Sequence, residues 1–283
     1  MIKKGLRTLQ LDLRDYKHSV VFGAISLPET FIIENLKIKN QDNSDLCTAF
    51  AVTTASEAQE CIELSPEYQF QKIKYLMGDF DDWGADLRTA VKSLVKFGSL
   101  ESSKNPFPLG VVSRDFIANW ANWDVTLDYQ ALVHQKKTYF SILGYEDIKQ
   151  AIYQHKTPVI TGALWRTSWI YSGNGIVNSE YEQDGFGHAF VFIGWKKINN
   201  KEYLVAHLSN GESIGDKGRF YFSKDIVDKE CSFGNFVIVD MPRDKADYYN
   251  SNGVSIRDNW LTLFLKQAKS LSISILNFLD NNK

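Results

Sequence analysis

The chain has 283 residues, of which 44% are hydrophobic and 23% are charged, and its formal net charge is −2. This composition excludes a disordered or fibrous protein and predicts a soluble globular protein of one or two domains. Acidic and basic residues are well mixed and no basic stripe carries interleaved aromatics, so nucleic acid is not an expected partner.

The first 28 residues predict an extended N-terminal arm that leads into the domain. Residues 19–22 form a short β-like run, and Pro28 interrupts the pattern that follows. The arm begins with positive charges but has no apolar run behind them, so no signal peptide is expected. No stretch of about 18 apolar residues occurs in the sequence, so a transmembrane helix is not expected either.

Helical patterns follow the arm. Residues 47–64 are rich in Ala and Glu and predict a helix that is buried on most sides. A Ser-Pro pair at residues 65–66 is a start signal for a second helix. Two more helices are expected, over residues 85–98, where a glycine marks the end, and over residues 147–154.

The chain becomes strand-rich after Pro158. Apolar or alternating runs, separated by Gly, Asn and Asp clusters, predict antiparallel strands over residues 158–165, 188–195, 202–209, 218–223 and 235–240. Helices followed by antiparallel strands are typical of an α+β fold. This order also suggests two lobes with a cleft between them.

Residues 246–283 form the last predicted unit. Apolar residues recur at helical spacing between positions 256 and 279, with polar residues between them, which predicts a C-terminal amphipathic helix. The helix could dock on its own domain, or it could bind a partner chain or a membrane surface. The pattern leaves both alternatives open.

Cys47 begins the first predicted helix, six residues after Gln41. The positive end of a helix dipole lowers the pKa of a thiol and favours the nucleophilic thiolate. The Gln41 amide could donate to a developing oxyanion, with the backbone N–H of Cys47 as the second donor. The alternative is a small buried thiol with a structural role, since free cysteine is among the most buried residue types.

His188 opens an apolar strand after the glycine-containing turn at residues 185–187. A ring in this position can face a cleft while the strand behind it belongs to the core. A cysteine with a distant histidine is the recognised pattern of a catalytic thiol. A satisfied core histidine is the alternative, but the other four histidines lack such a setting.

Together these motifs resemble the papain family of cysteine peptidases. The matches are the Gln41–Cys47 spacing, the helix start at residues 47–51, Trp83-Gly84-Ala85, Gly187-His188-Ala189 and the turn at residues 215–220. They occur in the family's order and cover about residues 29–240. The resemblance implies a catalytic domain over residues 29–245, with a helical left lobe and an antiparallel, β-barrel-like right lobe.

The resemblance also implies residue roles. Cys47 would attack the peptide carbonyl, His188 would take and return the proton, and Gln41 would help to form the oxyanion hole. The implied substrate-binding residues are Gly84, Ala85 and Gly187. No cofactor is expected, and no metal site is expected because the cysteines and histidines lack metal-ligand spacing.

One departure concerns the residue that orients the catalytic histidine. The family uses an Asn in an Asn-Ser-Trp-Gly turn, and Leu208 falls at the Asn position here. Leu208 and Asn210 face the same side of an extended strand, so Asn210 could reach His188 from one step along. Alternatively, Asn210 only forms a turn with Gly211. Loss of the orienting residue would slow catalysis rather than abolish it.

Two further departures concern disulfides and regulation. Ser44 stands where many family members have a disulfide cysteine, and Cys47, Cys61 and Cys231 are too few for a disulfide framework. A reducing compartment is therefore expected, either the cytoplasm or a viral particle. The long inhibitory propeptide of the family is missing, so the arm could instead lie in or near the cleft.

Three functions compete on these observations. The first is a cysteine peptidase that acts on a peptide or protein substrate, with activity weakened by the missing Asn. The second is a degenerate family member that binds without cutting, as a structural part of a larger, viral assembly with a partner chain at the C-terminal helix. The third is a thiol amidase or acyltransferase, which uses the same Cys–His pair. Four residues of one segment could line a substrate groove, or they could lie at the interface between the lobes: Trp165, Trp169, Tyr171 and Val177.

Overall fold

The computed structural model describes residues 5–9, 12, 15, 17–80, 84–106, 124–178 and 185–239. All of them lie in the first of the two compact units of the chain, residues 1–240. The predicted C-terminal helix, residues 246–283, lies outside the described residues. Within the described part of the chain, no helix is long and apolar enough to cross a membrane.

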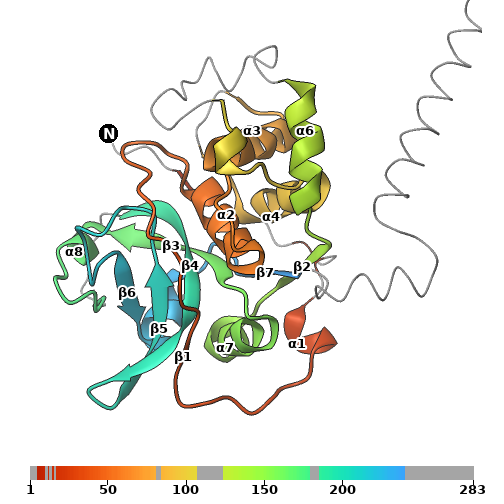
Figure 1. Cartoon of the computed structure of the whole chain (residues 1–283). Coiled ribbons are helices and arrows are strands. Elements are labelled where there is room, and N and C mark those ends of the chain that lie inside the picture. The colour runs from red at the N-terminus through yellow and green to blue at the C-terminus, as the bar shows by residue number, and fades with distance from the viewer. Residues whose placement is uncertain are drawn as a thin grey trace, which may run out of the picture. The chain divides into compact units, whose positions relative to one another are not determined.

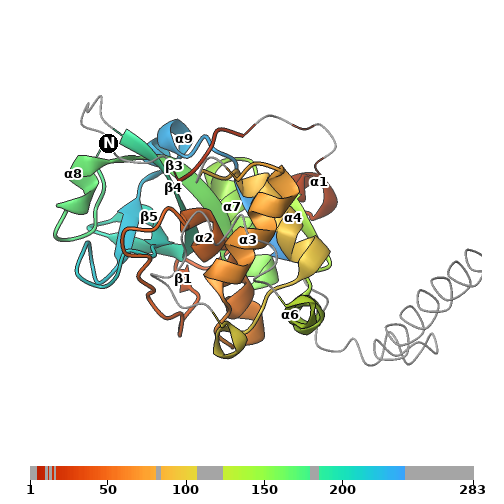
Figure 2. The same cartoon turned by 90° about the horizontal axis from the view of Figure 1, so that it is seen from above.

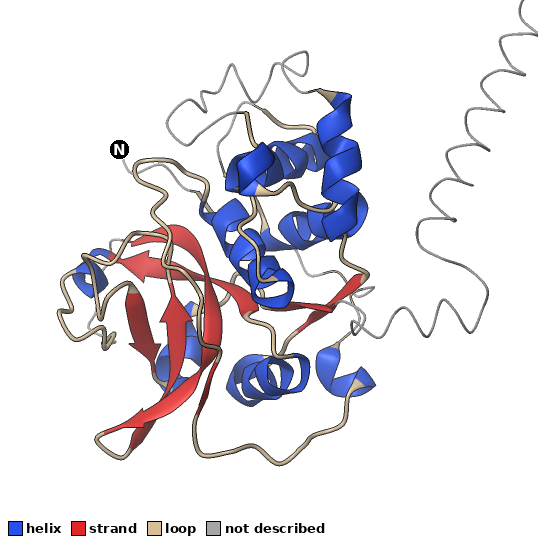
Figure 3. Ribbon diagram, in the orientation of Figure 1, coloured by secondary structure: helices blue, strands red, loops and turns tan. Residues whose placement is uncertain are grey.

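The described helices are α1 (His18–Val21), α2 (Cys47–Glu60), α3 (Pro66–Met77), α4 (Leu87–Phe97), α6 (Val125–Ala131), α7 (Gly144–His155), α8 (Thr167–Ile170) and α9 (Lys224–Glu230). The strands are β1 (Phe31–Ile32), β2 (Thr138–Ser141), β3 (Val159–Arg166), β4 (Gly185–Ile198), β5 (Lys201–His207), β6 (Arg219–Phe222) and β7 (Phe236–Val239). Helices α2, α3, α4 and α6 gather in one lobe, and the long strands lie in the other together with α7, α8 and α9 (Figure 1, Figure 3).

The strands form one antiparallel sheet with the order β2-β7-β3-β4-β5-β6, and β1 pairs with β4. This confirms the α+β class and the two lobes. The sheet differs from the expected barrel-like lobe, because in the described residues the path is open: β2 and β6 stand at its two ends. All five predicted strands are present, whereas the short β1 and β2 were not predicted.

Helix α2 is the central element of the helical lobe. It packs on β4 on one side and on α3 and α4 on the other (Figure 2). Its first ten residues are all buried, as the Ala-rich sequence predicts for a helix enclosed on most sides. It ends earlier than expected because Cys61 takes the left-handed conformation, with a φ of 56°.

The predicted start signal of α3 is confirmed, and a similar cap begins α4. The Ser65 side chain accepts a hydrogen bond from the Tyr68 N–H at 3.1 Å, which caps α3 just before Pro66. In the same way Asp86 accepts from the Thr89 N–H at 2.9 Å and caps α4. These caps fix where the two helices begin behind α2.

The prediction of a β-like conformation at residues 19–22 is wrong, because residues 18–21 form the short helix α1. The reason is tertiary: His18 and Phe22 pack onto the side chain of His155 in α7, and this anchoring decides the local backbone against β propensity.

Candidate active site

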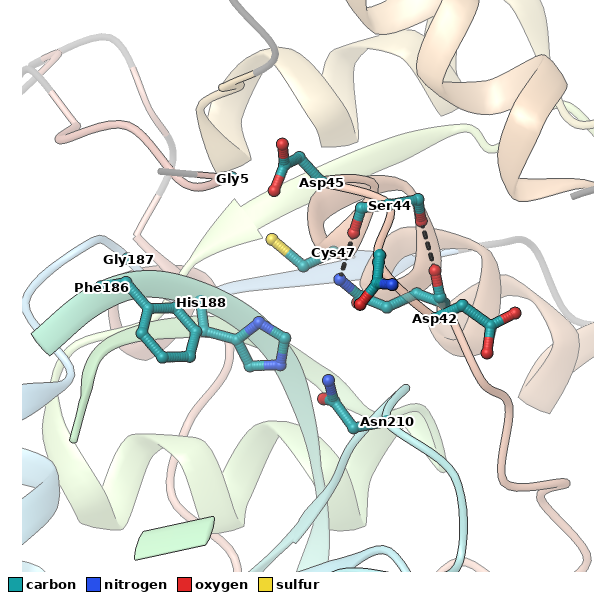
Figure 4. A pocket seen from close by; sticks show the side chains of 11 residues that line it. Gly5, Asp42, Ser44, Asp45, Cys47, Phe186, Gly187, His188 and Asn210 are labelled. Carbon is teal, nitrogen blue, oxygen red and sulfur yellow. Dashed lines mark hydrogen bonds between the residues drawn. The ribbon is translucent and has the colours of Figure 1, made fainter. Parts of the chain in front are cut away.

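A pocket of about 420 Å³ lies where α2 meets β4 (Figure 4). It is lined by Gly5, Gln41, Asp42, Asn43, Ser44, Asp45, Cys47, Phe186, Gly187, His188 and Asn210. The four predicted catalytic residues therefore come together from four separate parts of the sequence. Two of them, Cys47 and His188, come from regular elements that pack on each other.

Cys47 is the first residue of α2, as expected, but its thiol is covered. Its side chain is 1% exposed, and a Cβ added to Gly5 would lie 3.0 Å from its Sγ. Burial raises the pKa of the Cys47 thiol to about 12, more than the hydrogen bond with Ala189 lowers it, and the charge of Asp45 adds to the rise. The thiol is therefore neutral in this conformation, contrary to the activated thiolate that the helix start predicts.

His188 lies in β4 opposite Ala163 of β3. The small partner leaves room for aromatic rings around the imidazole: Trp165 meets it edge-on at 5.6 Å between ring centroids, and Phe186 at 6.0 Å. Burial lowers the pKa of His188 to about 4, and the neighbouring Asn210 opposes this effect. The imidazole is therefore also neutral at pH 7.

Asn210, rather than Leu208, faces the His188 ring (Figure 4). Leu208 is buried in the core of the β lobe. Among the described residues, neither Nε2 of His188 nor Oδ1 of Asn210 has a hydrogen-bond partner within geometric limits, although both atoms are buried. A small movement that joins these two atoms would satisfy both, because one can donate a proton and the other accepts.

Gln41 is held in place by a residue that the sequence did not single out. The hydroxyl of Ser209 donates to Oε1 of Gln41 at 2.7 Å. The backbone N–H of Gln41 donates to the Ser209 carbonyl, also at 2.7 Å. Its Nε2 donates one hydrogen to the Ser44 carbonyl at 2.8 Å, so the second amide hydrogen remains for the pocket. In the resemblance Ser209 falls at the Ser position of the family's Asn-Ser-Trp-Gly turn, but no role was predicted for it.

The N-terminal arm lies in the cleft. The backbone N–H of Arg7 donates to the Ala85 carbonyl at 2.9 Å, and the backbone N–H of Ala85 donates to the Gly5 carbonyl at 3.2 Å. These two bonds form a parallel bridge between Leu6 and Ala85. The arm therefore pairs with the backbone that the resemblance assigns to substrate, next to Gly84.

Glycines of the β lobe make room for Leu6. A Cβ at Gly187 would lie 2.4 Å from the Leu6 carbonyl oxygen, and one at Gly162 would lie 2.2 Å from its Cδ2. The contact at Gly187 is with backbone and cannot be relieved by a side-chain movement, so the arm can lie here only because Gly187 lacks a side chain. At Gly162 an added Cβ would force the Leu6 side chain to shift. Leu6 is buried in the resulting pocket, and Phe233 packs against the same cluster.

Several other candidates lie elsewhere. Trp169 and Val177 are buried in the core of the β lobe, and Tyr171 is exposed. Cys61 is exposed and Cys231 is buried away from the pocket lining. In the described ranges, no cluster of three or more His, Cys, Asp or Glu side chains could hold a metal ion.

Known proteins share this fold. A cysteine protease of Blomia tropicalis is 24% identical over 237 residues, which are 78% of this chain and 68% of that protein. The crystal structure of Xylellain, a cysteine protease from Xylella fastidiosa, superposes with a TM-score of 0.71 at 17% identity, covering 85% of this chain and 97% of that one. A digestive procathepsin L of the Tenebrio molitor larval midgut gives a TM-score of 0.60 at 16% identity, covering 77% and 71%.

These relatives contradict the prediction that the protein is located in the cytoplasm or in a viral particle. That prediction is wrong. They include a digestive proenzyme of an insect midgut and a mite protease. The expectation rested on the small number of cysteines. A domain of this size can bury enough apolar surface to fold without disulfides, so free thiols do not report on its compartment.

The family assignment agrees with the site. The sequence model of the papain family of cysteine proteases matches residues 32–241. This span contains Gln41, Cys47, His188 and Asn210, and it coincides with the two lobes described above. The chain therefore belongs to the papain family of cysteine proteases.

Proposed function

We propose that this protein hydrolyses peptide bonds through a thiol acyl-enzyme. The observation that carries the proposal is that Cys47, His188, Gln41 and Asn210 line one pocket. Their chemical types supply a nucleophile, a base, an oxyanion donor and a residue to orient the base.

Together with the substrate and water, these four groups account for every proton transferred and every bond made or broken in the reaction. The Cys47 thiol gives its proton to His188 and attacks the peptide carbonyl, whose oxygen takes negative charge beside the free Gln41 amide hydrogen and the Cys47 N–H. His188 then protonates the leaving amine. Water attacks the thioester, His188 takes its proton, and the acid product leaves as the thiol is restored. Asn210 accepts from Nε2 of His188 and keeps Nδ1 directed toward the thiol.

In the described conformation the N-terminal arm inhibits the active site. It covers the Cys47 thiol with Gly5 and fills the neighbouring apolar pocket with Leu6. A substrate therefore competes with an intramolecular occupant of the cleft. An open form, in which the arm has left, is the one that binds a peptide with an apolar side chain in the Leu6 pocket.

A casein-cleavage assay tests the proposal on the full chain with Leu6→Asp, a change that expels the arm. We expect this protein to cleave casein, and the additional change Cys47→Ala to lower the rate by at least about 10³-fold. Cys61→Ala is the matched control, because Cys61 is exposed and outside the pocket.

Two results would count against the peptidase. Cleavage that persists in Cys47→Ala would show that another group reacts. Absence of cleavage in a Leu6→Asp chain whose Cys47 reacts with alkylating reagents would favour the binding protein, or an amidase of narrower substrate range.

A further inference from the structure

A buried lysine lies behind one of the two backbone strands that meet in the cleft. Lys74 belongs to the last turn of α3, and the residue is 1% exposed. Its Nζ donates to the Gly84 carbonyl at 3.1 Å, in a buried contact. Lys74 lies outside the lining of the active-site pocket, and the proposed reaction gives it no role.

Burial of a lysine needs a physical reason. An ammonium group loses its hydration when it is buried, and this loss is offset only where protein groups accept its hydrogens. Packing alone would be served as well by an apolar side chain of similar shape. The position therefore indicates a task for the amine of Lys74, and the Gly84 carbonyl is an acceptor that it reaches.

The carbonyl that Lys74 binds and an amide that faces the cleft belong to one peptide unit. The Gly84 C=O and the Ala85 N–H lie in the same plane and point in opposite directions, as in any trans peptide. The Ala85 N–H donates to the Gly5 carbonyl at 3.2 Å. Lys74 therefore holds the unit from the helical lobe, while a chain in the cleft binds its other side.

Gly84 makes such a restraint necessary. Because glycine has no Cβ, the backbone next to this peptide unit has access to conformations that are closed to other residues. A rotation of the unit would turn the Ala85 N–H away from the cleft. No disulfide restrains the segment, since all three cysteines are free. The side-chain cap of α4 by Asp86 fixes the chain only after Ala85.

The lysine also makes the amide a better donor. A charged donor on a carbonyl polarises the whole peptide unit, which strengthens the hydrogen bond at the N–H end. Gly84 and Ala85 are both buried, and the low local dielectric enlarges this effect. The restraint and the polarisation act in the same direction, because both favour a backbone acceptor in the cleft.

We propose that Lys74 is a positioning residue of the substrate cleft, which holds the peptide unit between Gly84 and Ala85 so that the Ala85 N–H points at an extended chain. The consequence for hydrolysis rests on the proposed function, whereas the orientation of the amide does not. This amide binds the backbone of a substrate in the ground state and in the transition state alike. Its loss should therefore raise KM and leave kcat nearly unchanged.

Hydrogen exchange of the Ala85 amide, followed by NMR, tests the orientation directly. The full chain carries Cys47→Ala, so that it cannot cut itself. In Lys74→Met, which keeps most of the apolar stem but has no donor, the protection of this amide should fall by at least about tenfold relative to the amides of β4. Lys72→Met is the matched control, because Lys72 is a buried lysine of the same helix that pairs with Asp128 at 2.5 Å.

Steady-state kinetics in the Leu6→Asp chain test the consequence for a substrate. Lys74→Met should raise KM for an extended peptide by about tenfold and change kcat by less than about twofold. Lys72→Met should leave both constants near those of the parent, although it also removes an ion pair of α3. If Lys74→Met does not fold, Lys74→Gln replaces it, because this side chain is shorter by one bond and does not reach the carbonyl.

Three results would overturn the role of Lys74. One is an Ala85 amide with the same protection in the variant and in the parent. Another is a loss of protection that Lys72→Met reproduces, since the lysine would then only stabilise the helical lobe. The third is an unchanged KM in a chain that cleaves the peptide. An Ala85 amide that loses protection in a chain that never cleaves casein would instead refute the proposed peptidase and leave the orienting role intact.

Discussion

In the full chain at pH 6, iodoacetamide should alkylate Cys61 first, and the single change Leu6→Asp should make Cys47 the fastest cysteine. Cys61 is exposed, whereas Cys47 is covered by Gly5 and its thiol has a pKa of about 12. With that pKa, about one thiol in 10⁶ is ionised at pH 6. Mass spectrometry of the alkylated peptides measures the order directly.

The expected acceleration of Cys47 alkylation follows from the free energy that holds the arm in the cleft. Leu6→Asp removes about 2 kcal/mol of apolar burial and places a carboxylate in an apolar pocket, which costs several kcal/mol more. The arm should therefore leave the cleft, and the reaction of Cys47 should accelerate by at least about 10³-fold. Thr8→Asp is the matched control, since Thr8 lies in the same arm and is exposed. If both variants left Cys61 the faster residue, the arm would not be what restrains the thiol.

Gln41→Ala in the Leu6→Asp chain should lower kcat for peptide hydrolysis by about 10²–10³-fold, with little change in KM. The reason is that its free amide hydrogen stabilises charge that develops only in the transition state. Ser209→Ala should cost less, about tenfold, because it removes only the bond that holds Oε1 of Gln41. Steady-state kinetics on one peptide substrate measure both effects.

Asn43→Ala is the control for these kinetics, since Asn43 lines the same pocket. A Gln41→Ala protein with kcat within twofold of its parent would exclude the oxyanion role. A purely structural effect of Ser209 would lower stability without separating kcat from KM.

The regular elements were largely predictable because their signals are local. The Ser65-Pro66 start of α3 and the long apolar runs of β3 and β4 need no distant partner to be recognised. The run at residues 19–22 failed because its conformation depends on α7, more than a hundred positions later. The short β1 exists only as the partner of β4.

The site was predictable where one segment carried its own chemistry. Cys47 at a helix start and His188 at a strand start are such cases, and Gln41 follows from its spacing. Asn210 stayed ambiguous because the choice between it and Leu208 depends on which side chain the turn directs at His188. Ser209 matches the Ser of the family's turn, but its role could not be predicted, since it depends on a bond to a residue 168 positions away.

The electrostatic state of the thiol could not be predicted from the helix start alone. A helix dipole contributes about 0.3–1 kcal/mol to a charge at its N-terminus. Burial beneath Gly5 acts in the opposite direction, and a rise in the Cys47 pKa from 9.0 to about 12 corresponds to about 4 kcal/mol. Burial therefore wins while the arm is in place, and the dipole can act only after the arm has left.

The pH dependence of Cys47 alkylation in the Leu6→Asp chain tests the central claim, that Cys47 and His188 form a catalytic pair. We expect the rate to stay high down to about pH 5, because a thiolate beside an imidazolium keeps an apparent pKa well below the ordinary value of a thiol. His188→Ala should restore the ordinary profile, with the rate falling tenfold per pH unit below about pH 8. An identical profile in the two proteins would contradict the pair.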